Sequence, residues 1–261
     1  MLEGKRIVVI GGTTGLGLSA AAAFVREGAR VVVTGRNPDH CREAETRLGS
    51  SVKAIPSDAV EEGSSEAAVE ACIALFGGFD GLYHVAGGSG RRFGDGPLHE
   101  LTLEGWRRTI DMNLTALMLS NRAAVKAFLS QGHGGAILNM GSVLGMSPSP
   151  RHFTTHAYAA AKAAVIGLTR SAAAHYAAHG IRINVLAPAL VATPMSARAQ
   201  DNPEIMDFIR TKQPLDGGRI GMPADLDGAA VYFLSDASRF TTGQVLHVDG
   251  GWDLSEGQYH D

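Results

Sequence analysis

One stretch decides the fold of this chain: Arg6-Ile7-Val8-Val9-Ile10-Gly11-Gly12-Thr13-Thr14-Gly15-Leu16-Gly17. Its apolar part, residues 7–10, predicts a buried strand, and the segment 16–27 predicts a helix. The three glycines at 11, 15 and 17 permit a tight turn between the two and let an anion approach the backbone. Free N–H groups at the start of a helix favour a phosphate there. The stretch therefore predicts a dinucleotide pyrophosphate site, with a tight turn that binds nothing as the alternative.

Short apolar runs continue to alternate with helix-like segments along the chain. Strands are expected at residues 30–34, 52–57, 81–85, 136–140, 181–186 and 244–248, and helices at 38–48, 65–76, 104–130, 155–178 and 224–234. Continuous β-branched runs are typical of strands that are buried on both faces. We therefore predict an α/β fold: a single doubly wound domain over residues 1–261, with a parallel seven-stranded sheet and helices on both faces.

The composition is ordinary for a globular protein. The 261 residues are 45% hydrophobic and 19% charged, with a net charge of −3. This charge gives no electrostatic reason to expect a nucleic acid or an anionic membrane surface as a partner. Cys41 and Cys72 form no Cys-x-x-Cys motif, so we expect no disulfide framework. Because we find no signal-like start and no long apolar segment, we expect a cytoplasmic protein.

A tyrosine and a lysine lie four residues apart in the run Ala157-Tyr158-Ala159-Ala160-Ala161-Lys162. On a helix, side chains four apart share one face, with Cβ atoms about 5–6 Å apart. An ammonium beside a phenol favours the phenolate, so it lowers the pKa of the tyrosine from its usual value of about 10. We predict that Tyr158 is an acid–base catalyst supported by Lys162. The pair alone arises by chance in roughly 0.1 matches per chain, so its weight depends on other motifs.

Further motifs resemble those of the short-chain dehydrogenase/reductase family, in the family's order and over nearly the whole chain. The glycine turn resembles the fingerprint T-G-x-x-x-G-x-G, with Ile10 in place of the threonine. The run His84-Val85-Ala86-Gly87 resembles N-N-A-G, with both asparagines replaced. The run TGQVLHVDGG at 242–251 also matches the family. The resemblance implies a Rossmann fold and hydride transfer between a nicotinamide cofactor and an alcohol or carbonyl substrate.

The resemblance also implies a catalytic tetrad. Ser142 follows the fifth predicted strand and resembles the serine that stabilises charge on the substrate oxygen. Asn113 resembles the asparagine that holds a water molecule in a proton relay. Tyr158 would transfer the proton, and Lys162 would in addition reach the nicotinamide ribose. We expect no metal ion, because no HExxH motif or convergent carboxylate pattern accompanies the chain's paired histidines.

The second predicted strand ends in Gly35-Arg36, where an acidic residue would bind the ribose hydroxyl of NAD. The guanidinium of Arg36 can instead pair with a 2′-phosphate, so we predict that NADP(H) is preferred over NAD(H). The alternative is an arginine that is merely solvated. The resemblance places these other residues at the cofactor: Gly11, Thr13, Thr14, Gly15, Leu16, Gly17, Asp58, Ala59, Ala86, Gly87, Tyr158, Lys162, Pro188, Val191 and Thr193.

Three positions near the predicted cofactor, in two segments, depart from the family pattern. The missing asparagines remove hydrogen bonds that would tie the turn at Ala86 to its neighbours. We interpret His84 as a satisfied structural histidine; replacement of one of those bonds is the other possibility. Ala189 stands where the family has glycine, and this restricts the backbone beneath the nicotinamide.

Three loops are expected to choose the substrate: residues 88–97, 146–156 and 195–222. The third is rich in proline and glycine and is predicted to be a lid, with an ordinary surface insertion as the alternative. The second contains candidate specificity residues, namely His152, Phe153 and His156. The first contains Arg91-Arg92, which could meet an anionic substrate but which we interpret as solvated loop charges.

We predict an NADP(H)-dependent oxidoreductase that acts on a small alcohol or carbonyl compound. One alternative is a 3-oxoacyl-thioester reductase of fatty-acid synthesis, for which a basic docking patch of Arg91, Arg92, Arg107 and Arg108 is the only hint. The other is a dinucleotide-binding regulatory protein without turnover. The resemblance further implies a homotetramer in which helices at 104–130 and 155–178 pair across subunits.

Overall fold

Seven parallel strands form one sheet in the computed structural model, which describes residues 1–257. The strand order is β3-β2-β1-β4-β5-β6-β7, so the chain reverses its winding direction between β1 and β4. The strand bounds are β1 Arg6–Ile10, β2 Arg30–Gly35, β3 Val52–Pro56, β4 Gly81–His84, β5 Gly135–Met140, β6 Ile181–Pro188 and β7 Val245–Val248. The predicted α/β class and the parallel seven-stranded sheet are confirmed.

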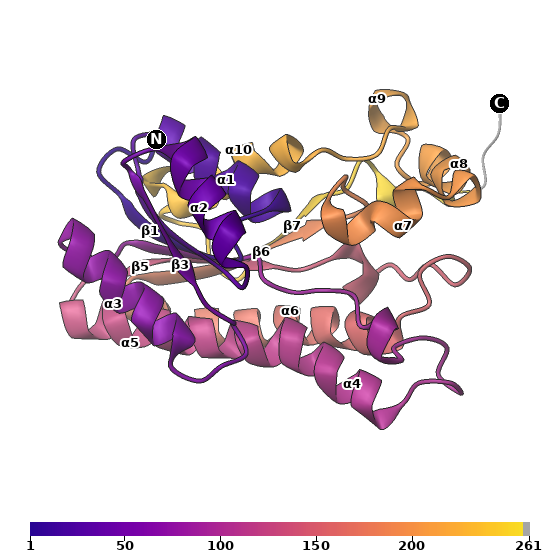
Figure 1. Cartoon of the computed structure of the whole chain (residues 1–261), viewed down its shortest axis with the longest axis horizontal. Helices are drawn as coiled ribbons and strands as arrows, with labels where there is room; N and C mark the ends of the chain where they lie inside the picture. The colour runs from indigo at the N-terminus through magenta and orange to yellow at the C-terminus, as the bar shows by residue number, and fades with distance from the viewer. Residues whose placement is uncertain (258–261) are drawn as a thin grey trace.

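Helices cover both faces of this sheet because its strands are apolar on both faces. Ile7 and Val9 of β1 point to one face and Val8 and Ile10 to the other, and all four are at most 1% exposed. One face packs against α1 (Gly15–Arg26), α2 (Pro38–Leu48) and α10 (Asp227–Leu234). The other packs against α3 (Ser64–Phe76), α5 (Ala116–Gln131) and α6 (His156–Tyr176) (Figure 1).

Two helices begin with a capping asparagine that is followed by a proline. Asn37 accepts a hydrogen bond from the backbone N–H of Asp39, and Pro38 occupies the first position of α2. Asn202 likewise accepts from the N–H of Ile205 at the start of α8, Pro203–Lys212. Asparagine satisfies an otherwise unpaired helix N–H, and proline has no N–H to lose. The local sequence therefore determines where these two helices begin.

The long helical region that we predicted over residues 104–130 is confirmed, but it contains an irregular turn that the sequence did not reveal. The structure has α4 (Leu103–Ile110), then a π-helical turn at Asp111–Thr115, then α5. At the end of this turn the N–H of Ala116 bonds to the carbonyl of Asp111, five residues back. The side-chain amide of Asn113 donates a hydrogen bond to the carbonyl of Thr109 at 2.9 Å. The interruption thus arises where Asn113 uses helix backbone for its own hydrogen bond.

The segment 195–222 folds into short helices rather than an irregular stretch. It contains α7 (Ala197–Gln200), α8 and α9 (Leu215–Gly218). Ala199, Ile205 and Ile209 are at most 3% exposed and pack in one cluster with Val143 and Trp252. The segment therefore has an apolar face of its own that rests on the sheet's carboxyl end. Whether it moves as a lid stays a prediction.

Both cysteines are buried thiols without a disulfide bond, as expected. Burial raises the pKa of Cys72 to about 12, which keeps this thiol protonated and unreactive. In the part of the chain that the structure describes, no helix combines the length and the apolar character that a membrane span would need.

Candidate active site

The predicted site residues gather at the carboxyl ends of the central strands. β1 ends at Ile10, before the glycine turn, and β4 ends at His84, before the Ala86-Gly87 pair. β5 ends at Met140, just before Ser142, and β6 ends at Pro188. Ligands of open parallel sheets bind outside these carboxyl ends, where neighbouring connections leave in opposite directions.

The glycine turn forms a cradle that side chains would fill. Gly11 has a φ of +85°, and a Cβ atom on it would lie 2.7 Å from the backbone nitrogen of Ala86. A Cβ on Gly17 would lie 2.1 Å from the carbonyl oxygen of Gly11. Thr14, the residue that precedes α1, makes no side-chain bond to that helix. The turn is thus shaped to expose backbone N–H groups at the start of α1, which fits a pyrophosphate.

The predicted ribose end of the site is closed to an acidic residue. A Cβ on Gly35 would lie 2.1 Å from Oγ1 of the buried Thr13, so aspartate or glutamate there would displace Thr13. Arg36, the next residue, is exposed. Asp58, by contrast, accepts a local hydrogen bond at 3.3 Å from the N–H of Val60. Ala59 is partly buried against the core.

The segment after β6 folds back toward the glycine turn. A Cβ on Gly15 would lie 3.5 Å from Cγ2 of Thr193, which joins two predicted cofactor residues far apart in sequence. Gln213, which the sequence did not single out, fixes this segment through Leu190. Its Oε1 accepts from the N–H of Leu190 at 3.0 Å, and its Nε2 donates to the carbonyl at 3.2 Å. Ala189 is accommodated without a positive φ.

Tyr158 and Lys162 lie one turn apart near the start of α6, as predicted. The ammonium nitrogen of Lys162 is 5.5 Å from the centre of the Tyr158 ring. It donates a hydrogen bond at 2.8 Å to the carbonyl of Met140, the last residue of β5. Lys162 is only 3% exposed, and this burial lowers its pKa to about 8. The lysine therefore ties the catalytic helix to the end of the central strand.

The predicted direction of the Tyr158 pKa shift is wrong for the protein groups alone. Burial raises the pKa of Tyr158, and a hydrogen bond with Ser142 opposes that rise. The Lys162 ammonium is engaged by Met140 rather than by the phenol oxygen, so it does not outweigh the burial. The proximity of Ser142, Tyr158 and Lys162 was predicted, but the electrostatic balance among them was not.

Asn113 is placed by its π-helical turn against the loop that follows Gly87. Its side chain accepts from the N–H of Gly88 at 3.1 Å and donates to the carbonyl of Gly88 at 2.9 Å. A Cβ on Gly87 would lie 2.7 Å from Oδ1 of Asn113 and 3.8 Å from Nζ of Lys162. Asn113 and Lys162 therefore meet around Gly87, next to the glycine cradle.

Asp95 is a site residue that the sequence did not reveal. It is 3% exposed, and its two carboxylate oxygens accept from the N–H groups of Ala157 and Tyr158, each at 3.0 Å. Thr155, which immediately precedes α6, makes no side-chain bond to the helix. The helix that carries Tyr158 is thus capped by a loop residue sixty-two positions upstream.

His84 is a buried side chain whose two ring nitrogens are both hydrogen-bonded. Its Nε2 lies 3.0 Å from the carbonyl of Ala86, which can only accept, so Nε2 carries the proton. Its Nδ1 then accepts from the hydroxyl of Ser120 at 2.7 Å. The ring is fully buried, and this burial together with the nearby Lys162 charge lowers its pKa to about 3. The structural interpretation of His84 is confirmed.

This buried neutral histidine predicts a specific acid sensitivity. The folded pKa lies below the unfolded value, so the unfolded chain binds more protons, and stability falls as pH decreases through 6.5. Between pH 7 and pH 5, His84 should contribute a loss of about 2 kcal/mol in the free energy of unfolding. In urea denaturation, His84→Asn should flatten this slope, whereas His99→Asn, at an exposed histidine, should not. Equal slopes in all three proteins would contradict the assignment.

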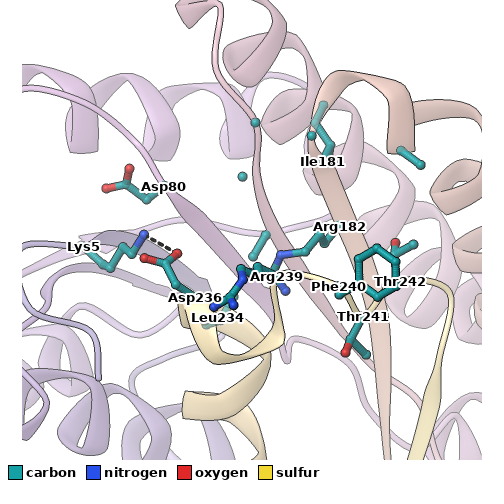
Figure 2. A pocket seen from close by; sticks show the side chains of 15 residues that line it. Lys5, Asp80, Ile181, Arg182, Leu234, Asp236, Arg239, Phe240, Thr241 and Thr242 are labelled. Carbon is teal, nitrogen blue, oxygen red and sulfur yellow. Dashed lines mark hydrogen bonds and ion pairs between the residues drawn. The ribbon is translucent and has the colours of Figure 1, made fainter.

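A cavity of about 600 Å³ lies at the end of the sheet opposite the predicted active site. It is lined by residues that precede or begin strands, such as Lys5, Asp80 and Ile181 (Figure 2). Several of its charged groups are paired: Lys5 contacts Asp236 at 2.8 Å, and Arg182 donates to backbone carbonyls at the end of α10. This cavity is therefore separate from the predicted chemistry.

Among the reactions that a dinucleotide cradle can serve, hydride transfer requires a proton donor at the same place, and Tyr158 lies there. The class of protein is therefore a nicotinamide-dependent oxidoreductase. A model of the family described as "Enoyl-(Acyl carrier protein) reductase" matches residues 11–253. The chain is also 37% identical over 252 residues to a 2,5-dichloro-2,5-cyclohexadiene-1,4-diol dehydrogenase of Sphingobium indicum, covering 96% of this chain and 98% of that protein.

Two further comparisons agree. The chain is 33% identical over 255 residues to an NADP-dependent (R)-specific alcohol dehydrogenase of Lentilactobacillus kefiri, covering 96% of this chain and 97% of that protein. The structure of a short-chain type dehydrogenase/reductase from Mycobacterium ulcerans superposes with a TM-score of 0.89 at 33% identity, covering 97% of this chain and 91% of that chain. The chain belongs to the short-chain dehydrogenase/reductase family, and it is an oxidoreductase.

Proposed function

We propose that this protein interconverts an alcohol and a carbonyl compound, with NADP(H) as its preferred cofactor and Tyr158 as its acid–base. The observation that carries the proposal is the close grouping of Ser142, Tyr158 and Lys162 beside the glycine cradle. When bound, the nicotinamide cofactor would supply or accept the hydride. The reaction then requires the protein only to orient the substrate and to move one proton.

Each residue of the tetrad has a role that its contacts support. Tyr158 gives the proton to a carbonyl oxygen, or takes it from a hydroxyl. Ser142, which is 7% exposed and lies beside the Tyr158 hydroxyl, would donate a hydrogen bond to the same substrate oxygen. Lys162 holds α6 against β5 and would also bind the nicotinamide ribose. Asn113 fixes the loop at Gly88 and would hold a water molecule for proton relay.

The preference for NADP(H) is supported by the closed position of Gly35 and the exposed Arg36. Without an acidic residue at 35, the ribose 2′-hydroxyl of NAD loses its usual acceptor, whereas a 2′-phosphate gains a guanidinium. The Lentilactobacillus kefiri relative is named as NADP-dependent, in agreement with this proposal.

Arg36→Ala should weaken NADPH binding about tenfold or more and leave NADH binding unchanged, because only NADPH carries the 2′-phosphate. Fluorescence titration of each cofactor would measure both dissociation constants. Arg47→Ala, at an exposed arginine of the neighbouring α2, is the matched control. An equal loss of affinity for both cofactors would show that Arg36 does not bind the 2′-phosphate.

The thioester-reductase alternative depends on its proposed docking patch. Arg91 is half-buried and Arg108 contacts Glu104 at 3.3 Å, whereas Arg92 and Arg108 both lie over the Phe93 ring, so the patch forms only in part. A comparison of turnover on a 3-oxoacyl thioester with turnover on simple ketones and polyols would separate the two activities. A strong preference for the thioester would reverse the order of these proposals.

We also propose a cytoplasmic homotetramer in which residues 195–222 close over the substrate. The tetramer is supported by partly exposed apolar side chains along α4 and α5, including Leu103, Trp106 and Met118. Light scattering that gave the mass of one 27.3 kDa chain would contradict it. Proteolytic protection of α7 and α8 by cofactor plus substrate would test the lid, and unchanged cleavage would argue against it.

A further inference from the structure

Two arginines from different loops converge on one backbone oxygen. The Nη2 of Arg91 lies 3.3 Å from the carbonyl oxygen of His152, and the Nη2 of Arg198 lies 3.4 Å from the same oxygen. These residues come from the three loops that were predicted to choose the substrate. Each loop leaves a strand end that carries a predicted site residue: Gly87 precedes Arg91, Ser142 precedes His152, and Thr193 precedes Arg198.

This pairing places like charges together without a matching carboxylate. Burial lowers the pKa of Arg91, the Arg198 charge lowers it further, and Asp95 opposes both effects. Within residues 1–257, no carboxylate lies within 4 Å of either guanidinium. Asp95 supplies one negative charge nearby, and its two oxygens accept from the start of α6. Two guanidiniums therefore share one carboxylate, which leaves a net positive charge at this point.

The carbonyl of His152 leaves most N–H donors of the half-buried Arg91 without a protein partner, and the exposed Arg198 extends the same positive charge to the surface. Each guanidinium offers five N–H donors, and each side chain makes this one hydrogen bond among the described residues. Both bonds are also longer than the usual range of about 2.7–3.2 Å. The neighbouring Arg151 forms an ion pair with Glu204. An arginine of this region that only stabilises a loop therefore does have an acidic partner.

We propose that Arg91 and Arg198 form an anion subsite of the substrate pocket, and that the substrate is an alcohol or ketone carrying a carboxylate or sulfonate group. Guanidinium groups match the geometry of oxyanions and can bind them with two parallel hydrogen bonds. The inference rests on the proposed function, since it names the substrate class for that same site. It replaces our interpretation of Arg91 as a solvated loop charge.

The test uses matched pairs of substrates that differ only in charge. Wild-type protein and the variants Arg91→Ala, Arg198→Ala and the double variant are assayed on a series of hydroxycarboxylates, their methyl esters and the corresponding hydroxysulfonates. Each single variant should raise KM for the anions about tenfold and leave kcat and the ester KM nearly unchanged. Arg198→Lys should recover part of the loss, and Arg92→Ala, at an exposed neighbouring arginine, should have no effect.

The outcomes separate this subsite from the proposed function. Equal changes in KM for acids and esters, or no change for either, would overturn the subsite while the ester reaction would still support the oxidoreductase. If carboxylates and sulfonates respond differently, the larger response identifies the anion. If no member of the series is turned over, thermal shift with the hydroxycarboxylates decides: stabilisation of the wild type but not of the double variant supports the subsite, and equal shifts overturn it.

Discussion

Tyr158→Phe should lower kcat by about 10²–10⁴-fold while cofactor affinity stays close to that of the wild type. Phenylalanine keeps the ring that packs near Lys162 but removes the hydroxyl beside Ser142. Hydride transfer would then leave an alkoxide, or start from an undissociated alcohol, without a positioned proton partner. The loss should therefore appear in the chemical step rather than in binding.

Single-turnover kinetics and a cofactor titration would separate these two effects. Tyr232→Phe is the matched control, because Tyr232 is 36% exposed and its hydroxyl contacts Thr241 far from the site. The control should keep full activity. If Tyr158→Phe retained full activity as well, the assignment of Tyr158 as the acid–base would be wrong, although the family and the fold would stand.

The features that could be predicted are those whose residues lie close together in the sequence. All the residues that shape the glycine turn lie within a few positions of one another, from the end of β1 to the start of α1. Tyr158 and Lys162 lie four apart, so helical geometry alone places them on one face. The sheet followed from apolar runs that alternate with helices, because each run is short and buried on both faces.

The features that could not be predicted depend on contacts between distant segments. Asn113, in the π-helical turn, accepts a hydrogen bond from Gly88 in a distant loop. The helical periodicity of the sequence does not reveal this bond. The Tyr158 pKa depends on burial and on Met140, which engages the lysine that was expected to act on the phenol. Arg91 looked like a loop charge because Arg198 is far along the chain. A single sequence does not state which loops meet.

Asp95 is the distant contact with the strongest expected effect on catalysis, and Asp95→Ala should lower kcat about 10²-fold. The carboxylate fixes the first turn of α6 through Ala157 and Tyr158. It also places a negative charge at the N-terminus of a 21-residue helix, where the helix dipole favours it. Without it, two N–H groups lose their partner, and the Tyr158 hydroxyl is no longer held in position. Misplacement by about 1 Å is enough for a loss of this size.

A graded pair of variants separates positioning from simple destabilisation. Asp95→Asn keeps one acceptor oxygen but points an NH₂ group at the second N–H, so its kcat should fall between those of the wild type and Asp95→Ala. Asp201→Ala, at an exposed aspartate, is the control. All variants are assayed well below their melting temperatures, where a purely stabilising residue would lower Tm but leave kcat intact. A lowered Tm with unchanged kcat would show that Asp95 serves the fold alone.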